Sequence, residues 1–390
     1  MSILRVNTIT NSGSAVDLPQ KLKIGGASIE QGYTSSGSEP GSPSTGDFWW
    51  DSSNDKLYRY IDGGFKELSL GSTGVALTWG GIRGLFVGGG TNSGKHNVIQ
   101  YITITTPGNA TDFGDLTAVS EGGSTAGNKA RVVHKKGIDA HGGWSVGHTH
   151  AIDYFAPATT GNATDFGDSL CYTARHAAVS NGTRAIYGGG YGAQATSGTW
   201  SQAGPNIVDY VTIANTGNAT DFGDLSAGGN GLGSTNDDTR GLFYGGYTGS
   251  GLNRIDYITM ASAGNSTDFG DTQGAMAYYV MKGVVSNNTI GIFAGGYHDT
   301  TSYTRTNIIS KVTIQTTGNA TDFGDLTRAA ITGAQCSDGT TGCIQTGEGA
   351  SYSPQIDKIT IATAGNATDF GDVITADYLS GADGVSGNAS

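Results

Sequence analysis

The sequence has few charged residues, few prolines and almost no cysteine. Of its 390 residues, 14% are charged, 7 are proline and 3 are cysteine. So few cysteines in so long a chain exclude a disulfide-stapled scaffold. Apolar runs extend over only a few residues, so we expect no transmembrane helix and no membrane insertion. The opening segment MSILRVNT has no apolar stretch, so we also expect no secretory signal peptide.

Glycine, in contrast, is abundant. There are 66 glycines, more than twice the usual share of about 7%. They follow no strict Gly-X-Y period, which excludes collagen. The composition indicates a soluble, β-rich protein with one large domain and a smaller appendage.

An eight-residue phrase, GNATDFGD or GNSTDFGD, occurs six times at intervals of 47 to 56 residues. A period near 50 is typical of propeller blades. Each copy carries two aspartates and no basic residue, so the six copies together account for the net charge of −12. No basic stripe remains to contact phosphates, and nucleic-acid binding is disfavoured. The copies begin at Gly108, Gly161, Gly217, Gly264, Gly318 and Gly365.

Each period contains the same ordered parts. An apolar run stopped by glycines comes first, as in residues 84–89, and for blade two we assign it to residues 138–143. An alternating, β-branched strand follows, then the repeated phrase as a turn with one phenylalanine anchor, then a variable fourth strand such as residues 172–179. These parts predict an all-β, six-bladed β-propeller spanning residues 73–390. We expect a carboxy-terminal strand near residues 376–385 to close the ring by pairing into blade one.

The blade pattern resembles the kelch repeat, in which Gly-Gly ends a buried strand, tyrosine follows and an aromatic residue anchors the unit. This chain has phenylalanine where kelch units usually carry tryptophan, and blade six lacks the Gly-Gly pair. The repeated phrase GNATDFGDL is also similar to proteins of tailed bacteriophages, notably phages of marine bacteria. The resemblance implies a virion structural protein.

Residues 1–72 lack the repeat. We expect a linker at residues 34–46 and a β-meander at residues 47–69, with SSND and DGG as its turns. The meander resembles amino-terminal modules of phage tail fibres, which implies that this segment attaches to the particle. A small cap on the ring and a seventh blade formed by residues 48–68 are the alternatives. The aromatic residues of this module are Phe48, Trp49, Trp50, Tyr58 and Tyr60.

Few residues in the sequence are candidates for metal binding or catalysis. The repeated aspartates suit turn-type bonds to backbone N–H groups better than calcium binding, because the loop lacks calcium-loop spacing. His148 and His150 are weak metal candidates, since two ligands do not complete a zinc site. Cys336 and Cys343 could approach each other across a hairpin, and reduced thiols are the default. The asparagine sequons should carry no glycan, and we expect no cofactor and no catalytic group.

Loop aromatics are the better candidates for binding, because flat rings suit sugars. Four of these aromatic residues directly follow the glycines, and the alternative for them is a structural role in which they fill the space between neighbouring blades. Their repeated placement from blade to blade favours this alternative. Those four are Trp144, Tyr191, Tyr247 and Tyr297, and the same loops hold Trp200, His298 and Tyr303.

Together these features favour a non-enzymatic phage protein: a tail fibre, tip or surface decoration located in the virion and assembled in the host cytoplasm. We expect a homo-oligomer that contacts other virion proteins through its amino-terminal module and binds host surface glycans. One alternative is a capsid decoration protein without a receptor role. Another is a glycan hydrolase using non-repeated acids, which would have to converge in one cleft; these are Asp139, Asp237, Asp238, Asp299 and Glu348.

Overall fold

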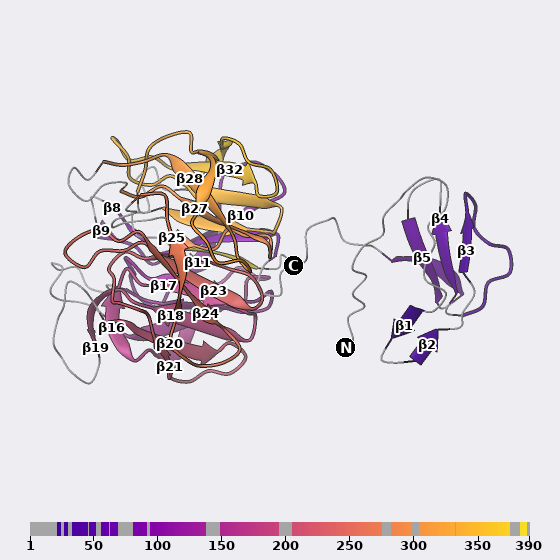
Figure 1. Ribbon diagram of the computed structural model, residues 1–390, viewed down its shortest axis with the longest axis horizontal. Helices are drawn as coiled ribbons and strands as arrows, with labels where there is room; N and C mark the ends of the chain where they lie inside the picture. The colour runs from indigo at the N-terminus through magenta and orange to yellow at the C-terminus, as the bar shows by residue number, and fades with distance from the viewer. Residues whose placement is uncertain are drawn as a thin grey trace. The chain divides into compact units, whose positions relative to one another are not determined.

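The chain divides into two units, Met1–Thr73 and Gly74–Ser390, which are described separately below. Figure 1 shows the computed structural model with its strands labelled. The structure describes residues 22–24, 27–29, 33–45, 47–51, 56–61, 63–68, 81–91, 94–137, 149–194, 205–274, 282–297, 304–331, 333–374 and 383–387. Every regular element within these ranges is a β-strand, so the predicted all-β class is confirmed.

The second unit is a six-bladed β-propeller, as the sequence predicted. From the hub outward, blade one contains β34 (Asp383–Gly387), β7 (Arg83–Val87), β10 (Val98–Thr103) and β11 (Thr111–Asp115). Blade two contains β12 (Ser124–Gly127), β13 (Val132–Lys135), β14 (Ala151–Phe155) and β15 (Thr164–Asp168). Blade three contains β17 (Ala177–Ser180), β18 (Arg184–Gly188), β20 (Ile207–Thr212) and β21 (Thr220–Asp224).

The remaining blades follow the same plan. Blade four contains β22 (Gly233–Asn236), β23 (Arg240–Tyr244), β24 (Arg254–Thr259) and β25 (Thr267–Asp271). Blade five contains β27 (Ile290–Ala294), β28 (Ile308–Thr313) and β29 (Thr321–Asp325), with Ser286 bridged to the inner edge of β27 at Gly291. Blade six contains β30 (Ala334–Ser337), β31 (Thr341–Gln345), β32 (Gln355–Thr360) and β33 (Thr368–Asp372). Three short elements accompany the blades: β26 (Lys282–Gly283) pairs with β30, β8 (Gly90–Thr91) with β9 (Gly94–Lys95), and β16 (Cys171–Ala174) with β19 (Tyr191–Gln194).

The ring closes through β34, which pairs antiparallel with β7 along its whole length. This confirms the predicted closure by a carboxy-terminal strand, which spans residues 383–387 where residues 376–385 were predicted. Residues 48–68 belong to the other unit, so the alternative of a seventh blade is wrong.

The repeated phrase contains the outermost strand of each blade, whereas the sequence suggested only a turn and an anchor. Phe113 lies in a β-bulge, because the register of β11 shifts between Ile99 and Gln100 of β10. The bulge turns the ring of Phe113, which is 2% exposed, into the core between blades one and two. The five equivalent phenylalanines are also buried, one in each of the other inter-blade cores: Phe166, Phe222, Phe269, Phe323 and Phe370.

Two other sequence assignments are wrong. The glycine-stopped strand of blade two is β13, residues 132–135, and not residues 138–143, which lie outside the described residues. The variable strand expected at residues 172–179 is two strands, β16 and β17. They separate at Arg175, whose backbone φ is 60°, a left-handed conformation that interrupts a strand. The variable strand is also the innermost strand of the next blade.

The first unit holds a small sheet in the order β3-β4-β5-β6 and a separate hairpin. β4 (Phe48–Asp51), β5 (Lys56–Ile61) and β6 (Gly64–Leu68) form an antiparallel meander. β3 (Tyr33–Ser36) pairs in parallel with β4, so residues 34–36 are strand and not linker. The hairpin joins β1 (Leu22–Ile24) and β2 (Ala27–Ile29).

Candidate functional site

The outer rim of the ring is held by backbone bonds between neighbouring blades. Gly161 and Ala163 of blade two donate their N–H groups to the carbonyls of Phe113 and Asp115 at 2.8 and 2.7 Å. The side chain of Asn162 accepts the N–H of Asp115 at 3.1 Å. The other five joints repeat these three bonds, with Asn218, Asn265, Asn319, Asn366 and Asn109 in the place of Asn162.

This arrangement corrects the predicted role of the repeated aspartates. The side chain that accepts a backbone N–H at the rim is the asparagine of the next repeat, not an aspartate of the same repeat. The first aspartate of each copy, such as Asp112, is exposed. Among the residues that the structure describes, no group of three or more His, Cys, Asp or Glu side chains is placed to hold a metal ion.

A different set of aspartates, in the third strand of four blades, is buried and was not singled out from the sequence. Asp153 is 0% exposed and accepts the backbone N–H of Thr117 at 2.9 Å and its hydroxyl at 2.8 Å. It also pairs with Lys136 at 3.2 Å. Each of these aspartates therefore anchors the connection that arrives from the preceding blade. The equivalents are Asp209, Asp256 and Asp357, while blade one has Gln100 and blade five has Ser310.

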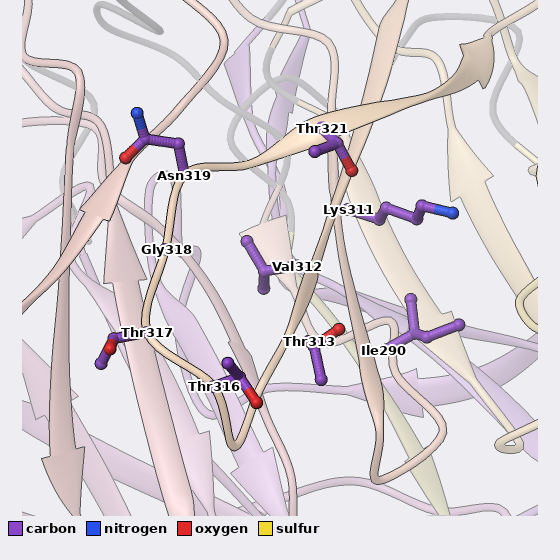
Figure 2. A pocket seen from close by; sticks show the side chains of 9 residues that line it. All are labelled: Ile290, Lys311, Val312, Thr313, Thr316, Thr317, Gly318, Asn319 and Thr321. Carbon is purple, nitrogen blue, oxygen red and sulfur yellow. The ribbon is translucent and has the colours of Figure 1, made fainter.

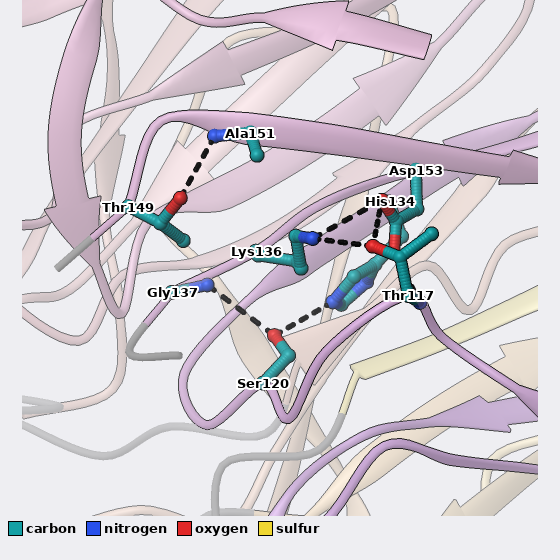
Figure 3. A network of polar contacts seen from close by, with 8 residues as sticks. All are labelled: Thr117, Ser120, His134, Lys136, Gly137, Thr149, Ala151 and Asp153. Atoms are coloured by element: carbon teal, nitrogen blue, oxygen red, sulfur yellow. Dashed lines mark hydrogen bonds and ion pairs between the residues drawn. The ribbon is translucent and has the colours of Figure 1, made fainter. Parts of the chain in front are cut away.

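Next to this anchor in blade two lies a buried serine–histidine pair (Figure 3). The hydroxyl of Ser120 lies 2.9 Å from Nε2 of His134, and Thr125 contacts Nδ1 at 2.9 Å. Burial, reinforced by the positive charges of Lys136 and Lys282, lowers the pKa of His134 to about 3. The geometry resembles a nucleophile and its base, but a histidine with so low a pKa is a weak base. We therefore interpret the hydrogen bond between Ser120 and His134 as a structural contact.

The hub is narrow and crossed by a side chain. Lys282, in the inner segment of blade five, donates its ammonium group to the carbonyl of Gly123 in blade two at 3.2 Å. His176 is fully buried and its Nδ1 lies 2.6 Å from the hydroxyl of Ser124. Burial lowers the pKa of His176 well below its usual value, and the charges of Lys135 and Lys282 lower it further. One cavity beside the inner strands β12, β17 and β34 has a volume of about 10 Å³, room for about one water molecule.

The connections between second and third strands emerge at one end of every blade, here called the loop end. Tyr191, Tyr247 and Tyr297 lie there and are half-buried. Their backbones pair with neighbouring segments, at Ala174 for Tyr191 and at Asn230 for Tyr247. The predicted binding residues Trp144, Trp200, His298 and Tyr303 lie outside the described residues.

At the loop end, an ion pair joins blades five and six. Arg305 and Glu348 approach to 2.7 Å, and their side chains are 34% and 23% exposed. The guanidinium of Arg305 also lies 6.0 Å from the ring centre of Tyr297. This cluster combines an aromatic ring with both charges, a combination that suits polar ligands.

The non-repeated acids do not form one site within the described residues. Asp237 and Asp238 lie in the turn between β22 and β23, which is the end of the blades opposite the loop end. Asp237 accepts backbone N–H bonds from Thr239 and Arg240 in that turn. Glu348 lies at the loop end, and Asp139 and Asp299 are outside the described ranges.

The structure also describes three other residues singled out from the sequence: His150, Cys336 and Cys343. His150 pairs with Asp168 at 3.2 Å and packs edge-on against Tyr172 with ring centres 4.2 Å apart, while His148 lies outside the described residues. Cys336 and Cys343 are free, buried and directly opposite each other on β30 and β31. Burial raises the pKa of both thiols, so the reactive thiolate is disfavoured.

In the amino-terminal unit, aromatic side chains pack on one another. Trp49 is 7% exposed and stacks on Tyr58 with ring centres 4.8 Å apart. Phe65 contacts both Trp49 and Tyr60 edge-on, at 5.4 and 5.2 Å. These rings form the small core of the unit. Phe48 and Trp50 are placed in β4 by the backbone alone.

A hollow lies in blade five, at the end opposite the loop end (Figure 2). It has a volume of about 290 Å³ and is called the blade-five notch below. The notch is formed by the start of β27, the end of β28 and the turn to β29. Its lining residues are Ile290, Lys311, Val312, Thr313, Thr316, Thr317, Gly318, Asn319 and Thr321.

The sequence matches no family model, and no curated protein resembles it at a significant level. The kelch and bacteriophage resemblances therefore stay hypotheses. Within the described ranges, no helix is long and apolar enough to cross a membrane.

Proposed function

We propose that the chain is a non-enzymatic binding protein of a bacteriophage virion, in which the loop end of the propeller recognises a host surface glycan or a neighbouring virion subunit. The amino-terminal unit attaches the ring to the particle. The virion part of the proposal is supported by the sequence resemblance of the repeat and of the amino-terminal module. The binding part is supported by the propeller scaffold, which is compatible with such a role.

The observation that carries the binding proposal is that repeated residues join the blades, whereas an unrepeated ion pair lies at the loop end. The rim asparagines, the buried phenylalanines and the third-strand aspartates all hold blades together. Arg305 and Glu348, which form an ion pair found in only one place in the described part of the ring, lie at the loop end beside Tyr297. A rigid frame with unlike loops at one end is the usual design of a recognition scaffold.

The proposal is tested with the full-length protein on host cells, on an array of bacterial surface glycans and on purified virions. We expect binding to at least one of them, and a loss of about tenfold or more in Tyr297→Ala, since aromatic contacts are often dominant in interfaces. Asp268→Ala, at an exposed rim position, is the matched control and should bind normally. Absence of binding to all three targets would refute the proposal.

The same glycan array separates binding from hydrolysis. A glycan hydrolase would release reducing sugar from the bound polysaccharide, and mutation of Glu348 or Asp299 would abolish the release. We expect no release. Attachment is tested independently, because deletion of residues 1–72 should abolish incorporation into virions and leave glycan binding intact.

A further inference from the structure

In the first four blades, one arginine–tyrosine pair fills the same position. The arginine at the start of the second strand lies over the tyrosine of the third strand, with the guanidinium carbon 4.5 to 4.7 Å from the ring centre. The arginine also donates to the backbone carbonyls of the next blade's turn. We call this pair the arginine clamp, and its members are Arg83 and Tyr101, Arg131 and Tyr154, Arg184 and Tyr210, and Arg240 and Tyr257.

Blade five lacks the clamp. Ile290 stands where the other blades have arginine, and Lys311 stands where they have tyrosine, since β27 and β28 pair in the same register. The blade-five notch lies against these two residues. Blade six also lacks the clamp, with Thr341 and Lys358 at the two positions. The notch therefore lies in one of the two blades in which the clamp has been replaced.

The lining of the notch has one positive charge and several hydroxyl groups (Figure 2). The ammonium group of Lys311 lies 6.0 Å from the ring centre of Phe323 and forms no ion pair within the described part of the chain. The amide oxygen of Asn319 accepts the backbone N–H of Asp271 in blade four, so this side chain points away from Lys311 (Figure 2). Ile290 supplies an apolar surface beside Lys311, and four threonines supply hydroxyls: Thr313, Thr316, Thr317 and Thr321.

We propose that the blade-five notch binds a carboxylated sugar, a single pyranose ring that carries one carboxylate. The carboxylate pairs with Lys311, the ring hydroxyls bond to the threonine hydroxyls, and the apolar face of the ring lies on Ile290. The volume of about 290 Å³ is at the lower limit for small-molecule pockets, which fits one sugar ring. One lysine matches a monoanion, whereas phosphate sites usually offer a fork of arginine donors or several backbone N–H groups.

This site is independent of the proposed function, because it lies at the opposite end of the blades from the loop end. The probes are glucuronate, glucose and inorganic phosphate, each titrated into the full-length protein and followed by calorimetry. We expect glucuronate to bind at millimolar or lower concentration, at least tenfold more tightly than glucose or phosphate. Phosphate binding that equals or exceeds glucuronate binding would overturn the sugar assignment, and no glucuronate binding would overturn the site.

Variants locate the binding. Lys311→Gln should weaken glucuronate binding tenfold or more, whereas Lys129→Gln, a lysine in a turn of blade two at the same end, should leave it unchanged. The pair Ile290→Arg with Lys311→Tyr rebuilds the clamp and should abolish binding without lowering the melting temperature. Unchanged glucuronate binding in Lys311→Gln would refute the assignment. Host-cell binding through the loop end should be unaffected by any of these changes.

Discussion

The two buried histidines should make the folded ring sensitive to mild acid. His134 and His176 are both 0% exposed and both have a lowered pKa, about 3 for His134 and well below 6.5 for His176. Between pH 6.5 and 5 the unfolded chain binds a proton at His134 and the folded chain does not, and the lowered pKa of His176 acts in the same direction. The histidines therefore contribute their full stability above pH 6.5, and this contribution falls as the pH decreases.

The magnitude follows from proton linkage. Each histidine that is protonated only in the unfolded state changes the free energy of unfolding by about 1.4 kcal/mol per pH unit. Over the interval from pH 6.5 to 5, His134 alone removes about 2 kcal/mol, and His176 adds to this loss in the same direction, against a typical stability of about 5–15 kcal/mol. The raised pKa values of Glu121 and Asp357 act in the opposite sense, because the folded chain binds those protons first.

The assay is urea unfolding of the full chain at half-unit steps from pH 7 to 5. The double variant His134→Gln with His176→Gln isolates the histidines, because glutamine keeps hydrogen-bonding capacity but does not titrate in this range. A wild-type stability that does not change between pH 6.5 and 5 would refute the reasoning, even if the double variant fails to fold. So would an unchanged slope in a folded double variant.

Three further changes test how the blades are joined. Gly114→Ala should destabilise the ring by at least about 2 kcal/mol, because an added Cβ would lie 2.4 Å from a backbone carbonyl of blade two and the backbone φ of Gly114 is +146°. An unchanged midpoint in urea unfolding would contradict the rim geometry. Asp256→Ala should lower the free energy of unfolding by about 3 kcal/mol, because it leaves the donors of the preceding connection unpaired. Asp268→Ala should change it by no more than about 0.5 kcal/mol. Equal effects of the two variants would refute the anchoring role. The double variant Thr341→Arg with Lys358→Tyr adds an arginine clamp to blade six. It should raise the free energy of unfolding by about 1–2 kcal/mol through a cation–π contact and a hydrogen bond. Calorimetric melting measures the change, and a lower melting temperature would count against the clamp.

The sequence was sufficient for the architecture because the strongest signals were local and repeated. Six copies of the repeated phrase, each with a phenylalanine anchor, predicted the number of blades. Blade two was misassigned because its second strand, β13, includes His134 and Lys135 in fully buried positions, where a polar residue looks unlike a core strand. The hydroxyls that make His134 tolerable lie 9 and 14 residues away.

The contacts between blades could not be read from the pattern. The sequence contains both Asn162 and Asp115 in equivalent copies, but their bond joins residues 47 apart. Only the three-dimensional ring shows which oxygen faces the neighbouring backbone. The blade-five notch was equally hidden, although one signal was present: Ile290 and Lys311 break a pairing that four other blades keep.

The pairing of β34 with β7 has a consequence for biosynthesis. A ribosome that has just produced Arg83–Val87 must add almost three hundred more residues before their partner strand, Asp383–Gly387, exists. Until then the inner edge of β7 has unpaired backbone groups beside Leu85 and Val87, which are buried in the finished ring. Such an edge invites premature association between nascent chains. The first blade to be translated is thus the last to be completed.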